Sequence, residues 1–157
     1  MNRKVLVVED DPAVRKAVSF ILEGNRHLVM TAANVRDAML LAPEADVILL
    51  DLKLGSESGD QFLQEFRSQG YYTPVIVLSG VFPRSDAEVR LKKYKIVDFI
   101  EKPFKAKDLL EKVESAEKVA GTMESTCEAA DRFVAATQNL RLLAGKSITE
   151  IGHRVQG

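Results

Sequence analysis

The sequence predicts an α/β fold in which a parallel sheet of five strands has helices on both faces. Two observations predict it. Short apolar runs recur along the chain, and most are continuous rather than alternating, as is typical of strands covered on both sides: residues 5–8, 28–30, 47–50, 75–78 and 96–100. Stretches with the apolar spacing of an amphipathic helix separate these runs. The order is therefore (βα)5, and right-handed crossovers make the sheet parallel and doubly wound.

Length and composition narrow the class of protein. The 157 residues suit one domain, or one domain with an appendage. Apolar residues make up 46% and charged residues 29%, which is near the average for a globular protein and excludes a disordered chain. The 22 basic and 23 acidic side chains give a net charge of -1, whereas a nucleic-acid-binding domain usually carries a basic excess.

Cysteine content and hydropathy favour a cytoplasmic protein with no membrane association. The single cysteine, Cys127, makes neither an internal disulfide nor a zinc knuckle and is interpreted as a small buried apolar residue. No apolar run approaches the roughly 20 residues that span a bilayer. Residues 1–4 are followed by only four apolar residues before Glu9, which argues against a signal peptide.

Capping residues mark the first two helices. Asp11 and Pro12 suit the N-cap and first position of a helix that Gly24 can end. Its apolar face consists of Val14, Val18, Ile21 and Leu22. Asn34 can cap a short second helix, whose apolar positions are Val35, Ala38, Met39 and Leu41.

Apolar spacing predicts three further helices. The third precedes Gly70, and Ser85 is a candidate cap for a weakly marked fourth. The apolar positions are Phe62, Leu63 and Phe66 in the third, Val89 and Leu91 in the fourth, and Leu109, Leu110 and Val113 in the fifth. Asp98 interrupts the last apolar run, which predicts that this strand lies near an edge of the sheet.

Residues 121–157 are predicted to form a helical extension of the 1–120 domain. A helix is expected over about residues 123–144, with Gly145 as its C-cap, and the anchors Phe133, Val134, Leu140 and Leu143. Residues 147–150 read as a capping box before a last helix with Ile148, Ile151 and Val155 on one face.

Charged and polar residues follow the predicted strands. Because the carboxyl ends of parallel strands meet at one edge, Glu9 and Asp10 are expected close to Asp51, with Ser79 and Lys102 beside them. Converging carboxylates repel one another unless they are compensated. A Mg²⁺ ion suits such oxygen ligands, and Lys102 supplies a fixed positive charge. This set fits phosphoryl chemistry with Asp51 as the nucleophile.

The charged and polar residues of the chain, taken singly, have ordinary structural roles. Asp11 is interpreted as a helix cap only, and Ser79–Gly80 alone would be a turn. His27 and His153 have no partner in the sequence pattern, so surface or capping roles are expected for them. Only the joint occurrence of the acidic residues, the hydroxyl and the lysine favours a phosphoryl site.

Glu9–Asp10, Asp51, Ser79 and Lys102–Pro103 follow the order and spacing of the receiver domain of bacterial two-component response regulators. The resemblance covers about residues 3–120. It implies a flavodoxin-like fold with strand order 2-1-3-4-5. It also implies phosphorylation by a sensor histidine kinase or a phosphotransfer protein. Because the family's aspartate is a stoichiometric acceptor, the resemblance implies a switch and not an enzyme.

The resemblance assigns the metal and phosphate residues. Asp51 is similar to the phosphoacceptor, Asp10 to the direct ligand of Mg²⁺ (or Mn²⁺), and Glu9 to its partner acting through water. The backbone carbonyl of Lys53 would complete the metal site. Lys102 resembles the family's lysine, and its bond to Pro103 is expected to be cis.

The resemblance also assigns switch residues and shows departures from the pattern. Ser79 matches the hydroxyl that turns toward the phosphoryl group, and Phe99 matches the aromatic that rotates with it, usually Tyr. Ordinary sheet packing is an equally weighted alternative for Phe99. Gly55 stands where the family usually has Pro, while Gly59 keeps the pattern. Lys53 and Val81 occupy positions that tune dephosphorylation.

The output of this receiver depends on residues 121–157. They carry no net charge, so no DNA binding is expected from this chain alone: the basic residues are Arg132, Arg141, Lys146 and Arg154, and the acidic ones Glu124, Glu128, Asp131 and Glu150. Residues 142–151 loosely resemble the first half of helix-turn-helix output domains, without room for a recognition helix. Two alternatives stay open: an incomplete DNA-binding transcriptional regulator, or a phosphorylation-independent binding module. The extension is expected to pack on its own receiver or in a homodimer.

Overall fold

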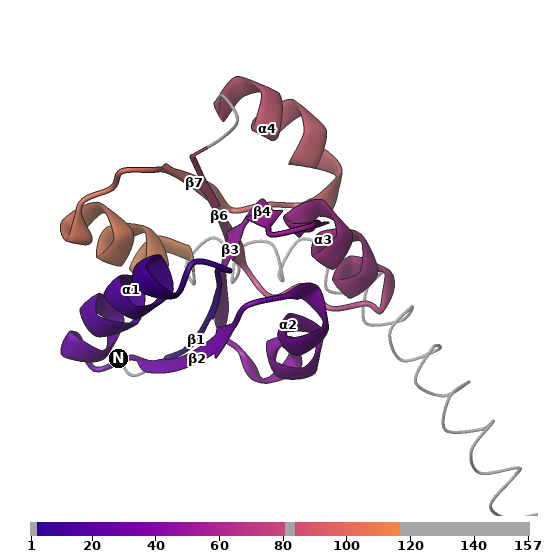
Figure 1. Cartoon of the computed structure of the whole chain (residues 1–157). Helices are drawn as coiled ribbons and strands as arrows, with labels where there is room; N and C mark the ends of the chain where they lie inside the picture. Colours follow the sequence, from indigo (N-terminus) through magenta and orange to yellow (C-terminus); the bar gives the residue numbers. More distant parts are fainter. Residues whose placement is uncertain (1–2, 81–83, 117–157) are drawn as a thin grey trace, which may run out of the picture. The chain divides into compact units, whose positions relative to one another are not determined.

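The computed structural model describes residues 3–80 and 84–116, and its centre is a parallel sheet of five strands (Figure 1). The strand order is β2-β1-β3-β6-β7, and each neighbouring pair is parallel. The strands are β1 (Lys4–Val8), β2 (Leu28–Ala32), β3 (Val47–Asp51), β6 (Val75–Ser79) and β7 (Asp98–Glu101). The predicted order 2-1-3-4-5 is therefore confirmed, counting the strands of this sheet alone.

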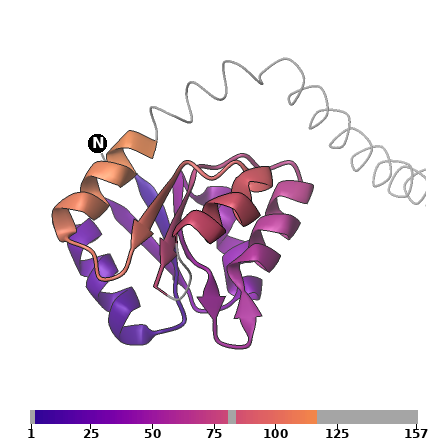
Figure 2. The same cartoon turned by 90° about the horizontal axis from the view of Figure 1, so that it is seen from above.

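Helices cover both faces of the sheet, as Figures 1 and 2 show. One face carries α1 (Pro12–Gly24) and the helix over residues 106–116. The other carries α2 (Val35–Leu41), α3 (Gly59–Ser68) and α4 (Arg84–Leu91). The buried apolar residues accordingly form two separate clusters, one on each side of the sheet. Most of the predicted helix anchors lie in them, among them Val18, Leu22, Ala38, Phe62, Phe66, Leu109 and Val113.

The predicted caps hold at the starts of the first two helices, and the first helix ends where predicted. The Asp11 side chain accepts a hydrogen bond from the Ala13 amide, and Asn34 accepts one from Asp37. Gly24 is the last residue of α1, as predicted, and the residue with left-handed φ after the helix is Arg26, at φ 66°. After α3, Gly70 adopts φ 87°, as its predicted position requires.

The fourth helix differs from the prediction in two residues. Ser85 is the second residue of α4, not its cap. Val89 was expected on the apolar face, but its side chain is 81% exposed. The buried pair is Ala87 and Leu91, which lie four residues apart and therefore share one face of the helix, whereas Val89 points the other way.

Short elements complete the described chain. The 3-10 turns η1 (Ala42–Glu44) and η2 (Lys92–Tyr94) precede the third and fifth strands of the sheet. β7 begins at Asp98, later than the apolar run at 96–100 indicated, and it is an edge strand as Asp98 predicted. A small antiparallel ribbon, β4 (Lys53–Leu54) with β5 (Glu57–Ser58), was not predicted.

Several predictions fall outside the described residues: the helices expected over 123–144 and after 147–150, Cys127, His153 and Val81. Within the described part of the chain, no helix combines the length and the apolar character needed to cross a membrane.

Candidate functional site

The functional side chains meet at the carboxyl edge of the sheet because the parallel strands end there together. Asp51 is the last residue of β3 and Ser79 the last of β6, while Glu9 directly follows β1. Ser79 pairs in register with Glu101, the last residue of β7, so Lys102 begins the loop beyond the same edge. Residues from four strands, far apart in the sequence, are thus brought to one place.

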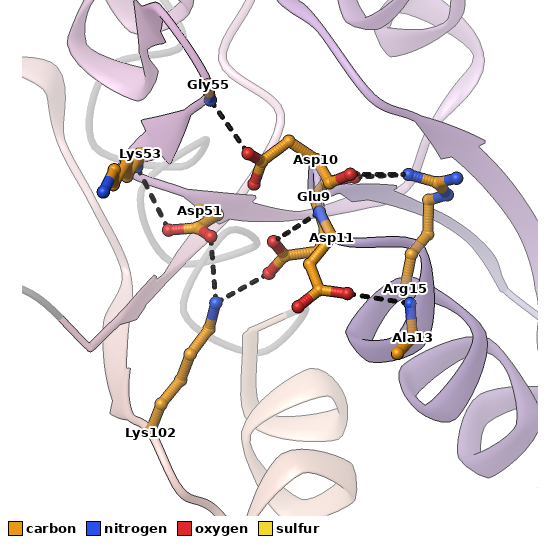
Figure 3. Close-up of polar contacts among 9 residues, drawn as sticks. All are labelled: Glu9, Asp10, Asp11, Ala13, Arg15, Asp51, Lys53, Gly55 and Lys102. Carbon is orange, nitrogen blue, oxygen red and sulfur yellow. Dashed lines mark hydrogen bonds and ion pairs between the residues drawn. The ribbon is translucent and has the colours of Figure 1, made fainter.

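Lys102 joins the acidic residues in the middle of this group (Figure 3). Its Nζ donates to Glu9 Oε2 at 2.7 Å and to Asp51 Oδ2 at 2.9 Å. The Lys102 amide donates to the Ser79 carbonyl at 2.8 Å, which fixes the start of the lysine's loop against β6. The Lys102–Pro103 peptide bond is cis, as expected.

Burial shapes the electrostatics of this ion-pair group. Glu9 is only 1% exposed, and burial raises its pKa to about 7. The hydrogen bond from Lys102 opposes this rise in pKa, whereas Asp51 adds to it. Burial by itself would lower the pKa of Lys102, but its hydrogen bonds to Glu9 and Asp51 raise that pKa above the ordinary value. The lysine therefore stays protonated near neutral pH and compensates the two carboxylates.

Asp51 is buried and its carboxylate is held on both oxygens. Oδ2 receives the Lys102 bond, and Oδ1 accepts from the Lys53 amide at 3.1 Å. Glu9, Asp10 and Asp51 each offer an oxygen in a group whose members lie within 4.8 Å of one another. Three hard oxygen donors at this separation are a donor set that suits a small divalent cation such as Mg²⁺.

The two predicted switch residues occupy different environments. Ser79 is 3% exposed at the end of β6, the strand that neighbours β3. Phe99 lies in β7, half-buried against the core on the α3 side of the sheet. Phe99 lines a surface cavity of about 330 Å³ together with residues of α4, η2 and β7.

Two contacts that the sequence analysis did not predict hold the acidic loop, residues 9–11, in place (Figure 3). The Arg15 guanidinium, from the first turn of α1, donates to the Glu9 carbonyl at 2.8 Å. The Gly55 amide donates to Asp10 Oδ2 at 2.9 Å. The contact of Arg15 could have been expected, because an arginine one helical turn after residues 9–11 can reach back to their carbonyls. Apart from the glycine itself, nothing in the sequence pointed to the contact between the Gly55 amide and Asp10.

Comparison with known proteins decides the family. The family described as response regulator receiver domain matches residues 5–114. The chain belongs to this family. The strand order and the acidic edge are therefore those of a receiver in two-component signalling, as the sequence pattern predicted.

Relatives and solved structures agree with this receiver assignment. The phosphate regulon transcriptional regulatory protein PhoB of Escherichia coli is 31% identical over 160 residues, which cover 97% of this chain and 68% of that protein. The receiver domain of the Francisella response regulator 1452 has a TM-score of 0.68 at 28% identity, covering 74% of this chain and 98% of that one. NtrX from Brucella abortus has a TM-score of 0.72 at 28% identity, covering 80% of this chain and 29% of that one.

The curated relatives are named as regulators, and the match spans only part of some of them. It covers 68% of the length of the Escherichia coli PhoB and 52% of that from Klebsiella pneumoniae. What the receiver controls is therefore argued below as a proposal.

Proposed function

We propose that this receiver accepts a phosphoryl group on Asp51 and thereby switches a surface that controls a partner. The observation that carries the proposal is the Lys102 Nζ that contacts both Glu9 and Asp51 at the edge of the sheet. A buried carboxylate held by a lysine and an amide is oriented before any donor arrives, so little reorganisation is needed for attack. A sensor histidine kinase or a phosphotransfer protein would supply the group.

The proposed step is a transfer between two side chains. A carboxylate oxygen of Asp51 attacks the phosphorus of a phosphohistidine, forming a P–O bond as the P–N bond breaks. The electron pair of the broken bond stays on the donor's imidazole nitrogen. Lys102 would remain paired with negative charge throughout, and its position beside Asp51 places it to neutralise the phosphoryl oxygens.

The acidic residues support a divalent cation at the same edge. Glu9, Asp10 and Asp51 would hold Mg²⁺ (or Mn²⁺), and the backbone carbonyl of Lys53 is proposed as a further ligand. When bound, the ion would neutralise charge on the transferring phosphoryl group. In this scheme Asp10 is the direct ligand and Glu9 acts through water.

The switch is proposed to run from Ser79 to the surface of α4, β7 and the helix over residues 106–116. Ser79 would turn its hydroxyl toward the phosphoryl group, and Phe99 would rotate with it. The cavity that Phe99 helps to line supports this second motion, since it leaves room next to a half-buried residue.

Intact mass spectrometry tests the proposal. The full chain is incubated with a small phosphodonor with and without Mg²⁺, beside Asp51→Asn, which keeps the size of the side chain. We expect one phosphoryl adduct that requires Mg²⁺ and is absent from the variant. Adduct formation by Asp51→Asn at the rate of the unmodified chain would rule out Asp51 as the acceptor.

Transcriptional regulation is the output that the comparisons favour. The alignment with Escherichia coli PhoB covers 97% of this chain and so continues beyond the matched receiver, and that relative is named a transcriptional regulatory protein. A mobility-shift assay at low salt tests whether residues 121–157 contribute DNA contacts. We expect no sequence-specific complex from this chain alone; a complex that survives competitor DNA would contradict that expectation.

A further inference from the structure

The β4–β5 ribbon places a glycine amide against the acidic edge. Leu54 pairs with Glu57, which leaves Gly55 and Ser56 as the two turn residues. Gly55 has φ +63°, whereas Ser56 does not have positive φ. A two-residue hairpin turn with positive φ at its first residue favours glycine there, because other L-residues are strained in that region.

This turn directs the Gly55 amide out of the ribbon and toward Asp10. The amide nitrogen lies 2.9 Å from Asp10 Oδ2, across 45 residues of sequence (Figure 3). Asp10 is more exposed than Glu9 and Asp51, so its carboxylate has more rotational freedom to lose on binding a cation. A proline at position 55 would have no N–H to donate and φ near −65°.

We propose that Gly55 is a positioning residue that, through its amide, orients the Asp10 carboxylate for divalent-cation binding. The inference rests on the cation site of the proposed function. Hydrogen bonds to ligating carboxylates fix their orientation, and loss of such outer partners commonly weakens metal binding by about 10- to 100-fold. The Gly55 contact is of this kind, since it comes from the backbone of a separate element and not from another ligand.

Three substitutions of Gly55 distinguish the loss of its amide N–H from strain in the turn. Gly55→Asn keeps the N–H and tolerates left-handed φ. Gly55→Ala keeps the N–H but strains the turn, although its Cβ would meet only Asp10 Oδ2 at an ordinary 3.9 Å. Gly55→Pro removes the N–H. Calorimetric titration of the full chain with Mg²⁺ should give Asn and Ala variants within about threefold of the unmodified Kd, and a Pro variant about tenfold weaker.

The outcomes distinguish this inference from the proposed function. Equal Mg²⁺ affinity for the Asn and Pro variants would overturn the role of Gly55 while leaving the cation site intact. An unmodified chain that binds no Mg²⁺ would overturn the cation site itself. If Gly55→Ala weakens Mg²⁺ binding as much as Gly55→Pro does, the cause is strain in the turn, and the role of the amide is also overturned.

A measurement on the metal-free chain keeps the inference testable if the Pro variant does not fold. Hydrogen exchange of the Gly55 amide, followed by NMR, should be slower than in an unstructured peptide because the amide is bonded to Asp10. Asp10→Ala removes the acceptor and should accelerate exchange at Gly55 about tenfold, as the loss of one hydrogen bond implies. Unchanged exchange in that variant would overturn the contact.

Discussion

Gly59 lies so close to the backbone at the end of β3, the strand that carries Asp51, that no side chain fits there. A Cβ on Gly59 would lie 2.7 Å from the Asp51 carbonyl oxygen and 3.0 Å from Leu52 Cα, both of which are backbone atoms. The Gly59 amide also donates to the Leu52 carbonyl at 2.9 Å. The helix α3 can therefore start this close to the end of β3 only with glycine at its first position.

Gly59→Ala should lower the free energy of unfolding by about 1–3 kcal/mol, the usual cost of overpacking a closely packed site. Gly24→Ala is the matched control, because nothing lies within 4 Å of a Cβ there. In a helix that change should be neutral or stabilising by up to about 1 kcal/mol. Urea denaturation of both variants measures the difference, and equal effects would contradict the close-approach argument.

His27 is buried, contrary to the surface or capping role that the sequence suggested. It is 6% exposed, and its Nδ1 has no hydrogen-bond partner among the described residues. Burial lowers the pKa of His27, and the positive charge of Arg3 lowers it further, while Glu114 acts in the opposite direction. Its protonated form is therefore less favourable in the folded chain than in the unfolded one.

This pKa direction predicts a loss of stability at acid pH. The unfolded chain takes up a proton on His27 near its ordinary pKa of about 6.5, and the folded chain only at lower pH, so stability falls as pH drops through this window. Above about pH 6.5 the contribution is fully present. Comparing urea denaturation at pH 8 and 5.5, we expect His27→Gln to lose less stability than the unmodified chain. Identical losses would contradict the prediction.

At the scale of elements, one arginine ties α3 to the segments on either side of the strand that follows it. Arg67, in the last turn of α3, donates to the carbonyls of Tyr94, Tyr71 and Thr73, each at 2.9 Å. Burial lowers the pKa of Arg67 to about 10, which still leaves it charged at neutral pH. The guanidinium thus satisfies three carbonyl groups from the α3–β6 connection and η2.

Arg67→Met should lower the free energy of unfolding by about 2–4 kcal/mol, because several carbonyl acceptors lose a charged donor at once. Arg36→Met, at an exposed position of α2, is the control and should change stability by less than about 0.5 kcal/mol. Thermal denaturation of the two variants provides the comparison. If Arg67→Met loses no more stability than Arg36→Met, the three carbonyls must find other hydrogen-bond donors when Arg67 is removed.

At the scale of the whole molecule, the sheet brings carboxylates that are far apart in the sequence together at one edge. Glu9 follows β1 and Asp51 ends β3, yet their oxygens and one of Asp10 lie within 4.8 Å of one another. Lys102 compensates two of the three carboxylates. The remaining repulsion opposes folding in the absence of a cation.

Mg²⁺ should therefore stabilise the fold by mass action, by about 2.7 kcal/mol at 100 times its Kd. A chelator should reverse this rise, and NaCl at the same ionic strength controls for screening of surface charges. Asp10→Asn, which removes one ligand charge, should reduce the Mg²⁺-dependent rise in Tm. An equal rise with NaCl would indicate general screening in place of a bound ion.

Much of the fold followed from local patterns, and the exceptions have identifiable causes. Continuous apolar runs located the strands, and Asp11 and Asn34 located two helix starts, because these signals depend on neighbouring residues only. Val89 was misplaced because a short, polar helix carries too few apolar residues to define its buried face. The β4–β5 ribbon has two residues in each strand, which is too short for any periodicity.

The sequence by itself determined the α/β class and the set of acidic, hydroxyl and lysine residues at the strand ends, because both depend on periodicity or on fixed spacing along the chain. The strand order was predicted only through the resemblance to receiver domains. Only the tertiary structure decided how these residues meet. It assigned the Lys102 contact to both Glu9 and Asp51, the burial of His27, and the Gly55 amide to Asp10. These contacts join elements far apart in the sequence, and distances across a sheet edge leave no trace in local patterns.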